Sequence, residues 1–350
     1  MSSPSPTAPR RRLSAALAAF VVLAAAPSPT PRSTAAVPLP VVAAVSGGGE
    51  TSLVVDLGAS ARIGKPGAVV TRNGVPEKAD LLPLMSAGLN VAMVVDTSEA
   101  GASTLPAWLS AAARFILEAP GSTESVVITA GAPAKTVITA REGPLPIVGA
   151  LNGLRAAGGR DTAAALRLAS LEFPDARPGR RLVVLYTTAD DAGDTRAETL
   201  AAGLRASGTI LVVVGTADPD RFWSDLAAET GGFFAPAGNP VVVPALDQVQ
   251  TTLRSRYLIR FPTPSQLPAR VGVQVRTTDL TFTSDATVPL PTVEESTEDS
   301  RWPAIAWAAG IVAVLVVLAV LLIKLGRRPD KAPPTIARGR ASVPRRDPNL

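Results

Sequence analysis

Two oxygen-bearing side chains that could hold a cation stand together in the middle of the chain. The apolar run Asn90–Asp96 (NVAMVVD) ends in a carboxylate, and the hydroxyl of Ser98 follows two residues later. The sequence contains no histidine and no cysteine. It therefore excludes thiol nucleophiles, Ser-His-Asp triads, disulfides and Cys/His metal clusters, and oxygen ligands for a hard cation become the chemistry to examine.

Alternating strand and helix patterns surround Asp96. Arg181–Thr187 (RLVVLYT) reads as a buried strand, whereas Leu105–Ala119 and Asp161–Leu171 show helical periodicity. This alternation predicts an α/β fold over residues 88–256, with a doubly wound, mainly parallel sheet covered by helices on both faces. In such sheets ligands bind outside the carboxyl ends of the strands, and Asp96 lies at one of these ends.

Short β-rich segments flank this α/β unit at residues 47–87 and 257–292. In the second segment, Tyr257–Phe261 (YLIRF) alternates and is expected to place Leu258 and Arg260 on the outer face. Each segment is too small to be stable alone. We therefore expect the two to pair in one small β-sandwich, with the α/β unit as an insertion. Two independent β pieces are the alternative.

The N-terminal residues have the features of an export signal. In residues 1–26, Arg10-Arg11-Arg12 precedes an apolar run that ends in small residues, which is typical of a secretory signal peptide. Residues 27–46 are rich in proline, serine and alanine, and we expect them to form a low-complexity lead-in.

The C-terminal residues have the features of a membrane anchor. Within residues 302–324, twenty consecutive uncharged residues are long enough for one transmembrane helix. Residues 293–301 are expected to form a stalk before it, and residues 325–350 a basic, disordered tail after it. The positive-inside rule then predicts a single-pass protein of the cell membrane, with the N-terminal part outside and the tail in the cytoplasm.

The net charge of +5 is unevenly distributed. Residues 1–26 and 324–350 hold 11 of the 34 basic side chains and only two of the 29 acidic ones, so residues 27–323 carry −4. Because the basic residues gather beside the predicted export and anchor segments, they indicate topology rather than a polyanionic ligand. Aromatic residues make up 4% of the chain, which also disfavours a nucleic-acid partner.

Three segments resemble the von Willebrand factor type A domain. VAMVVDTSEA (Val91–Ala100) is similar to the family's first strand and metal loop. RAAGGRDTAAALRLA (Arg155–Ala169) and RRLVVLYTTADD (Arg180–Asp191) are similar to later motifs, in the same order and spacing. The resemblance covers about residues 88–256, and the flanking β segments look like those of bacterial membrane-anchored members.

The resemblance implies a metal-ion-dependent adhesion site with the pattern DxSxS, Thr and Asp. Asp96 and Ser98 match its first two positions, whereas Ala100, Arg160 and Thr188 stand where the family has Ser, Thr and Asp. Two hydroxyls and a carboxylate are lost, and a permanent cation is added. We therefore expect a degenerate site that binds no cofactor, in which the Arg160 guanidinium pairs with Asp96 in place of the ion.

Other arrangements would keep a cation in this region. A live Mg²⁺ site with Asp96 and Ser98 as ligands is one alternative, in which Thr162 could supply an oxygen if its loop shifted. An acidic cluster follows the strand Arg181–Thr187: Asp190, Asp191 and Asp194. We expect these acids to be solvated loop and helix N-cap residues, with a relocated cation site as the alternative.

Three classes of function are compatible with this organisation. The first is a metal-independent binding module on the cell surface, which recruits a protein partner near Asp96, Ser98 and Arg160. The second is a structural or assembly factor of a cell-envelope complex. The third, a surface hydrolase, is disfavoured because the chain lacks histidine, cysteine and a G-x-S-x-G motif. The sequence therefore predicts a protein that is not an enzyme.

Overall fold

The computed structural model describes residues 36–58, 67–238, 243–278 and 280–290. The chain divides into two compact units, Met1–Pro291 and Thr292–Leu350, and all described residues belong to the first. The predicted signal peptide, stalk, transmembrane helix (302–324) and basic tail lie outside the described residues. Within the described ranges, no helix combines the length and apolar character needed to cross a membrane.

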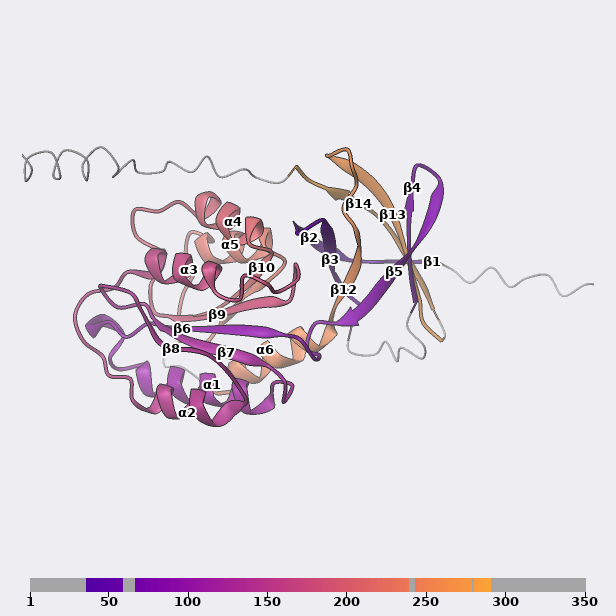
Figure 1. Cartoon of the computed structure of the whole chain (residues 1–350). Coiled ribbons are helices and arrows are strands. Elements are labelled where there is room, and N and C mark those ends of the chain that lie inside the picture. Colours follow the sequence, from indigo (N-terminus) through magenta and orange to yellow (C-terminus); the bar gives the residue numbers. More distant parts are fainter. Residues whose placement is uncertain (1–35, 59–66, 239–242, 279, 291–350) are drawn as a thin grey trace, which may run out of the picture. The chain divides into compact units, whose positions relative to one another are not determined.

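The α/β unit is built on a six-stranded sheet with the order β11-β10-β9-β6-β7-β8 (Figure 1). Its strands are β6 (Asn90–Val95), β7 (Glu124–Thr129), β8 (Lys135–Glu142), β9 (Arg181–Thr187), β10 (Thr209–Gly215) and β11 (Phe233–Pro236). All neighbours are parallel except β7 and β8, which are antiparallel. The predicted, mainly parallel sheet is therefore present.

Helices cover both faces of this sheet (Figure 1). One face carries α1 (Leu105–Glu118), α2 (Pro144–Asn152) and α6 (Val243–Ser255), and the other carries α3 (Thr162–Leu171), α4 (Ala197–Ala206) and α5 (Phe222–Glu229). The short 3₁₀ helix η1 (Glu99–Gly101) follows β6. Along β6, Met93 packs in the core under the first face and Val94 in the core under the second, which explains why the strand is apolar throughout.

The flanking segments form one eight-stranded sheet with the order β1-β14-β13-β4-β5-β12-β3-β2. Its strands are β1 (Ala36–Pro38), β2 (Val41–Gly47), β3 (Glu50–Asp56), β4 (Gly67–Arg72), β5 (Val75–Pro83), β12 (Arg256–Pro262), β13 (Ala269–Arg276) and β14 (Thr281–Val288). The hairpin β4–β5 turns at Asn73-Gly74, where both residues have positive φ, as a type I′ turn requires.

This sheet corrects the expected sandwich. Strands from before and after the α/β unit alternate within one hydrogen-bonded sheet, because β12 lies between β3 and β5 and β13 pairs with β4. The sheet curls so that β14 and β2 come into contact, and it encloses one core that includes Leu53, Val271 and Val288. A single curled sheet thus replaces two sheets packed face to face.

Two further expectations about this sheet are wrong. Residues 36–46, expected to belong to a low-complexity lead-in, contain β1 and most of β2. Leu258, expected on an outer face, is 1% exposed and shares a core with residues of β6 and β10. The physical reason is that β12 is covered on both faces, since the α/β unit packs against the face that would otherwise meet water.

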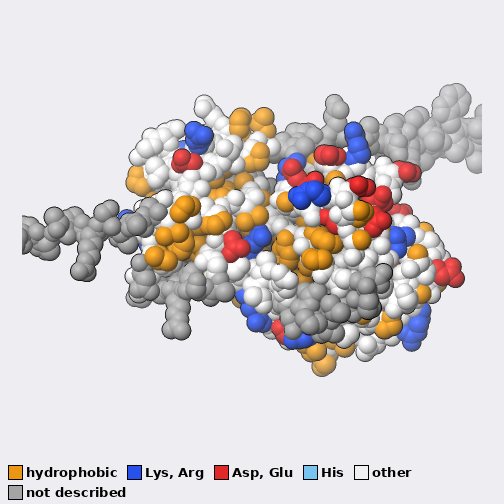
Figure 2. All heavy atoms as spheres, turned by 180° about the vertical axis from the view of Figure 1, so that it is seen from behind, with side chains coloured by type: hydrophobic (Ala, Val, Ile, Leu, Met, Phe, Trp, Pro, Cys, Tyr) orange, Lys and Arg blue, Asp and Glu red, His pale blue; other side chains and the backbone are white. Residues whose placement is uncertain are grey.

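Charged side chains on the surface lie close to partners of opposite sign. Figure 2 shows acidic and basic side chains interspersed over part of the face seen from behind. Exposed pairs of this kind include Arg221, directly before α5, with Asp225 of α5 at 3.2 Å, and Arg205 of α4 with Glu229 of α5. Pairs so exposed contribute little to stability. The buried arginines have a larger structural role.

Arg180, directly before β9, holds the connection between β5 and β6. It is 5% exposed, and its guanidinium donates hydrogen bonds to five backbone carbonyls of that connection: Pro83, Leu84, Ser86, Ala87 and Gly88. Burial lowers the pKa of Arg180 to about 10, with a contribution from the nearby Arg260, so the group remains charged at neutral pH. One side chain thereby fixes the path by which the chain enters the α/β unit.

We predict that Arg180→Leu lowers the free energy of unfolding by about 3 kcal/mol, because several buried carbonyls lose their donor together. Urea unfolding followed by circular dichroism measures this change. Arg177→Leu is the matched control, since Arg177 is 58% exposed and its nearest carboxylate, of Glu50, is 3.9 Å away. Equal stabilities of the two variants would show that the Arg180 contacts do not hold the connection.

Candidate functional site

The ends of β6 and β9 bring together the residues that the sequence singled out. Because β6 pairs with β9 in parallel, Asp96 and Thr188 emerge at the same edge of the sheet. Arg160 reaches this edge from the loop before α3, which is fixed by an isolated bridge between Arg160 and Gly131. Three loops, far apart in the sequence, thus meet around one carboxylate.

Asp96 is fully buried, and each of its carboxylate oxygens accepts hydrogen bonds. Its Oδ1 accepts from the backbone N–H of Ser98 at 3.0 Å. Its Oδ2 lies 2.8 Å from Nη2 of Arg160, and it accepts from the hydroxyl of Thr188 at 3.1 Å and from its N–H at 3.4 Å. A buried carboxylate requires such compensation, and here one cation and three donors supply it.

Arg160 takes the central position that the resemblance assigns to a metal ion. Its Nη2 contacts both Asp96 and the hydroxyl of Thr188, the latter at 2.7 Å. The side chain is 25% exposed, so part of the guanidinium faces solvent. Its Nε is buried, with no hydrogen-bond acceptor among the described residues. The pairing of Arg160 with Asp96 is the arrangement that the altered family pattern predicts.

The ionisation of Asp96 reflects two opposed effects. Burial by itself would raise the pKa of this carboxyl, but hydrogen bonds from the Ser98 hydroxyl and N–H, and the Arg160 guanidinium, outweigh burial and lower the pKa below 3.8. A carboxyl whose pKa is lower in the folded state contributes stability above its unfolded pKa, and that contribution is lost as the pH falls through the folded value. Asp96 is therefore a fixed negative charge at neutral pH.

The remaining residues of the metal-loop pattern surround this pair. The hydroxyl of Ser98 accepts from the N–H of Gly101 at 3.3 Å, which caps η1. Ala100 is exposed and adds no ligand oxygen. Gly101 was not singled out by the sequence, yet a Cβ there would lie 3.1 Å from an oxygen of Asp96, so a side chain at this position would push against the buried carboxylate.

The residues present do not fit a divalent cation. Asp96 and Ser98 could supply oxygens, but the guanidinium of Arg160 already lies 2.8 Å from Oδ2 of Asp96, and its positive charge would repel a cation there. The replacement of hydroxyls and a carboxylate at Ala100, Arg160 and Thr188 leaves too few oxygens for a hard cation. Within the described ranges, no cluster of three or more Asp, Glu, His or Cys side chains could hold a metal.

A cavity of about 430 Å³ lies beside this pair, at the start of α3. Asp191 and Asp194 of the acidic cluster line it, together with Arg160 and Arg167. Asp191 accepts from the N–H of Gly193 at 2.8 Å, as expected for a loop acid. The expected helix cap is wrong, because the N-cap residue of the following helix α4 is Arg196. Thr162, the alternative ligand, is buried, and its hydroxyl has no partner among the described residues.

We predict that Asp96 and Arg160 stabilise the folded protein through their interaction with each other. Asp96→Ala should destabilise the protein by about 3 kcal/mol, because it leaves the Arg160 cation without its carboxylate. Adding Arg160→Thr to Asp96→Ala should restore part of this loss. Chemical unfolding of the wild type, both single variants and the double variant measures the coupling. Additive effects would show that the two side chains do not stabilise each other.

Comparison with known proteins supports the assignment of this fold. Residues 91–191, which include Asp96, Arg160 and Thr188, match the family model described as von Willebrand factor type A domain. No curated protein sequence gave a significant match.

Solved structures with similar folds come from animals and bacteria. The proximal thread matrix protein 1 of the mussel byssus is 16% identical, with a TM-score of 0.44 over 53% of this chain and 51% of its own, so the chain spans about half of its length. BatB from Bacteroides thetaiotaomicron is 14% identical over 48% of this chain and 98% of its own, with a TM-score of 0.40. A von Willebrand factor type A protein from Catenulispora acidiphila is 12% identical over 71% of both chains, with a TM-score of 0.42. Residues 91–191, which supply β6, β9 and the loops around Asp96, therefore match the von Willebrand factor type A domain.

Proposed function

We propose that the protein is a membrane-anchored binding module that recruits a protein partner outside the cytoplasm without a metal ion. The partner would bind at the sheet edge formed by Asp96, Ser98, Ala100, Arg160 and Thr188. The observation that carries this proposal is the 2.8 Å ion pair between Arg160 and Asp96, which supplies positive charge where the family's adhesion site uses a divalent cation.

The geometry of Arg160 supports a role in recognition as well as in folding. A guanidinium has five N–H donors, and its contacts with Asp96 and Thr188 use one of its two terminal nitrogens. The side chain is partly exposed, so its other terminal nitrogen could donate to a partner's oxygen atoms. The buried Asp96 meanwhile holds the group in one orientation, which reduces the entropy that binding would otherwise cost.

Sequence features support the location and the absence of catalysis. The basic and apolar residues of 1–26 and the uncharged segment within 302–324 favour export and a single membrane anchor. We infer that the module is not an enzyme because the sequence has neither histidine nor cysteine, and because the edge around Asp96 holds an ion pair instead of a free base. An assembly role in a cell-envelope complex would use the same surface.

We predict that Mg²⁺ does not stabilise the wild-type protein. Millimolar Mg²⁺ should leave its melting temperature unchanged, because ligand stabilisation requires a concentration above the dissociation constant. The triple variant Ala100→Ser, Arg160→Thr and Thr188→Asp should instead melt at a higher temperature when Mg²⁺ is added. Differential scanning fluorimetry with and without a chelator measures both effects.

The matched control keeps Arg160 and replaces Arg167, which lines the neighbouring cavity and is not one of the partners of Asp96 described above: Ala100→Ser, Arg167→Thr and Thr188→Asp. It should remain insensitive to Mg²⁺, because the guanidinium beside Asp96 is still present. Stabilisation of the wild type by Mg²⁺ that Asp96→Ala abolishes would show that the site is live and that the metal-independent proposal is wrong.

Photo-crosslinking in intact cells tests recruitment of a protein through this edge. Benzoylphenylalanine is placed at Glu99 or Asp190, which are exposed beside the site, and at Glu124, which is exposed at the first residue of β7. We expect a crosslinked protein from the first two positions and none from Glu124, at the opposite end of the sheet. The product should also disappear in an Arg160→Ala background. Equal crosslinking from all three positions, or its persistence without Arg160, would contradict the proposal.

A further inference from the structure

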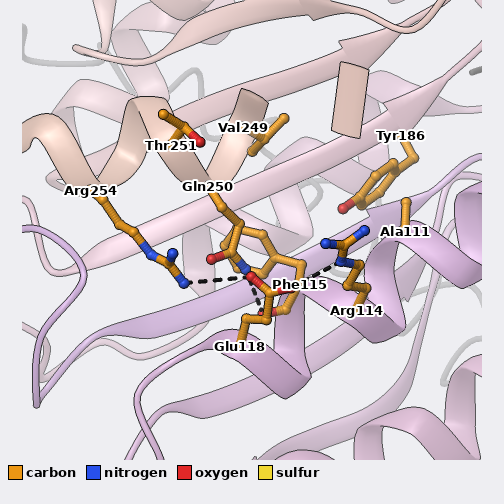
Figure 3. Close-up of a pocket in the computed structure, with 9 residues that line it drawn as sticks. All are labelled: Ala111, Arg114, Phe115, Glu118, Tyr186, Val249, Gln250, Thr251 and Arg254. Atoms are coloured by element: carbon orange, nitrogen blue, oxygen red, sulfur yellow. Dashed lines mark hydrogen bonds and ion pairs between the residues drawn. The ribbon is translucent and has the colours of Figure 1, made fainter. Parts of the chain in front are cut away.

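A second cavity, separate from the Asp96 edge, lies between α1 and α6 over β9. Its volume is about 200 Å³, which is small compared with a pocket for a drug-sized ligand. Figure 3 shows its side chains: Arg114 and Glu118 come from α1, Tyr186 from β9, and Gln250 and Arg254 from α6. None of these residues belongs to the metal-loop pattern.

The inner part of the cavity combines apolar side chains with two polar groups. Ala111, Phe115 and Val249 supply buried apolar surface. Tyr186 is 2% exposed, and its burial raises the pKa of the phenol, so the hydroxyl stays protonated. The second polar group is the carboxamide of Gln250, which Figure 3 shows between the two helices. The inner end can therefore enclose a short carbon skeleton and make hydrogen bonds to a polar group that the skeleton carries.

Gln250 has an unused acceptor inside the protein. The residue is 6% exposed, and its Nε2 donates to the backbone carbonyl of Phe115 at 3.2 Å. Its Oε1 is buried and has no hydrogen-bond donor among the described residues. Because buried polar atoms are nearly always paired in folded proteins, this oxygen indicates a position that a donor group should fill.

The mouth of the cavity carries the guanidinium groups of Arg114 and Arg254. Glu118 lies between two arginines, with 2.9 Å from Nε of Arg114 to Oε1 and 3.5 Å from Nη2 of Arg254 to Oε2. The long contact and 60% exposure of Arg254 show that this guanidinium is loosely held and can turn toward a ligand.

These features together select a ligand class. We propose that the cavity between α1 and α6 binds a small 2-hydroxy monocarboxylate, whose carboxylate meets Arg254 at the mouth and whose hydroxyl donates to Oε1 of Gln250. The carbon skeleton would lie against Phe115 and Val249, and a cavity of this volume suits roughly four to six carbon atoms. A hydroxyl fits better than an ammonium group, because the carboxamide offers no negative charge to compensate a buried cation.

The test uses two probes that differ only in the hydroxyl. The purified full-length chain in detergent is titrated with 2-hydroxy-4-methylpentanoate and with 4-methylpentanoate, and calorimetry gives each Kd. We expect the hydroxy acid to bind at least about tenfold more tightly, because a site built around a hydrogen bond discriminates against the analogue that lacks it. No binding of the hydroxy acid at about 10 mM, or equal Kd values for the two acids, would overturn the proposal.

Variants on the same helix separate the ligand contact from effects on folding. Gln250→Met, of similar length, should remove the preference for the hydroxy acid, whereas Gln248→Met, at an exposed position of α6, should retain it. Arg254→Gln should weaken both acids about equally and keep the preference. If the preference survives Gln250→Met, the assignment of the acceptor is wrong, and if Arg254→Gln leaves both Kd values unchanged, the anion-binding mouth is wrong.

Discussion

A carboxylate that is completely withdrawn from water must find positive charge and hydrogen-bond donors within the protein. Asp96 imposes this requirement on three loops at once, because Arg160, Thr188 and the turn at Ser98 each supply part of the compensation. In the family pattern a divalent ion stands at this point and is held by several oxygens. Here a guanidinium attached to the chain itself takes the central place. The differences from the family pattern at Ala100, Arg160 and Thr188 are therefore consistent with one another. Oxygen atoms are absent where a cation of the chain is present, and the paired guanidinium remains partly exposed at the surface.

Buried positive charges have the corresponding requirement for hydrogen-bond acceptors, and two of them lie where the α/β unit joins the curled sheet. Arg180 and Arg256 are both buried, and backbone carbonyls supply most of their compensation: five from the β5–β6 connection for Arg180, and the carbonyl of Gly231, at 2.8 Å, for Arg256. Asp56 lies 3.7 Å from the second guanidinium. Backbone carbonyls of loops and helix ends often have no backbone donor, so they need another donor when they are buried. An arginine at the junction can supply several donors, which packing of apolar groups cannot do. The shared core residues Val54 and Leu258 then exclude water around these contacts.

The parts of this structure that the sequence predicts are those with a strong local signal. Apolar runs such as Asn90–Val95 and Arg181–Thr187 must be buried on both faces, which predicts parallel strands, and Asn73-Gly74 specifies a hairpin. The pairing of Arg160 with Asp96 follows from the motif, because the altered positions are known to converge.

In contrast, the strands in residues 36–46 have a proline-rich context, and the burial of Leu258 depends on a second unit packing over β12. The carbonyl cluster around Arg180 likewise has no local signal, since its acceptors are backbone atoms about ninety residues away.

The placement of the insertion within the curled sheet determines how the domain would carry tension between its two ends. The described chain enters at β1 and leaves through β14, which are parallel neighbours, so a pull on the two ends would shear their short ladder of three residue pairs. The α/β unit departs after β5 and returns at β12, and these two strands are hydrogen-bonded to each other from Asp80–Arg260 to Pro83–Tyr257. Force that reaches β5 can therefore pass directly across this ladder to β12 without crossing the inserted unit. The loops around Asp96 would lie outside the load path, and their geometry would persist while the outer strands yield.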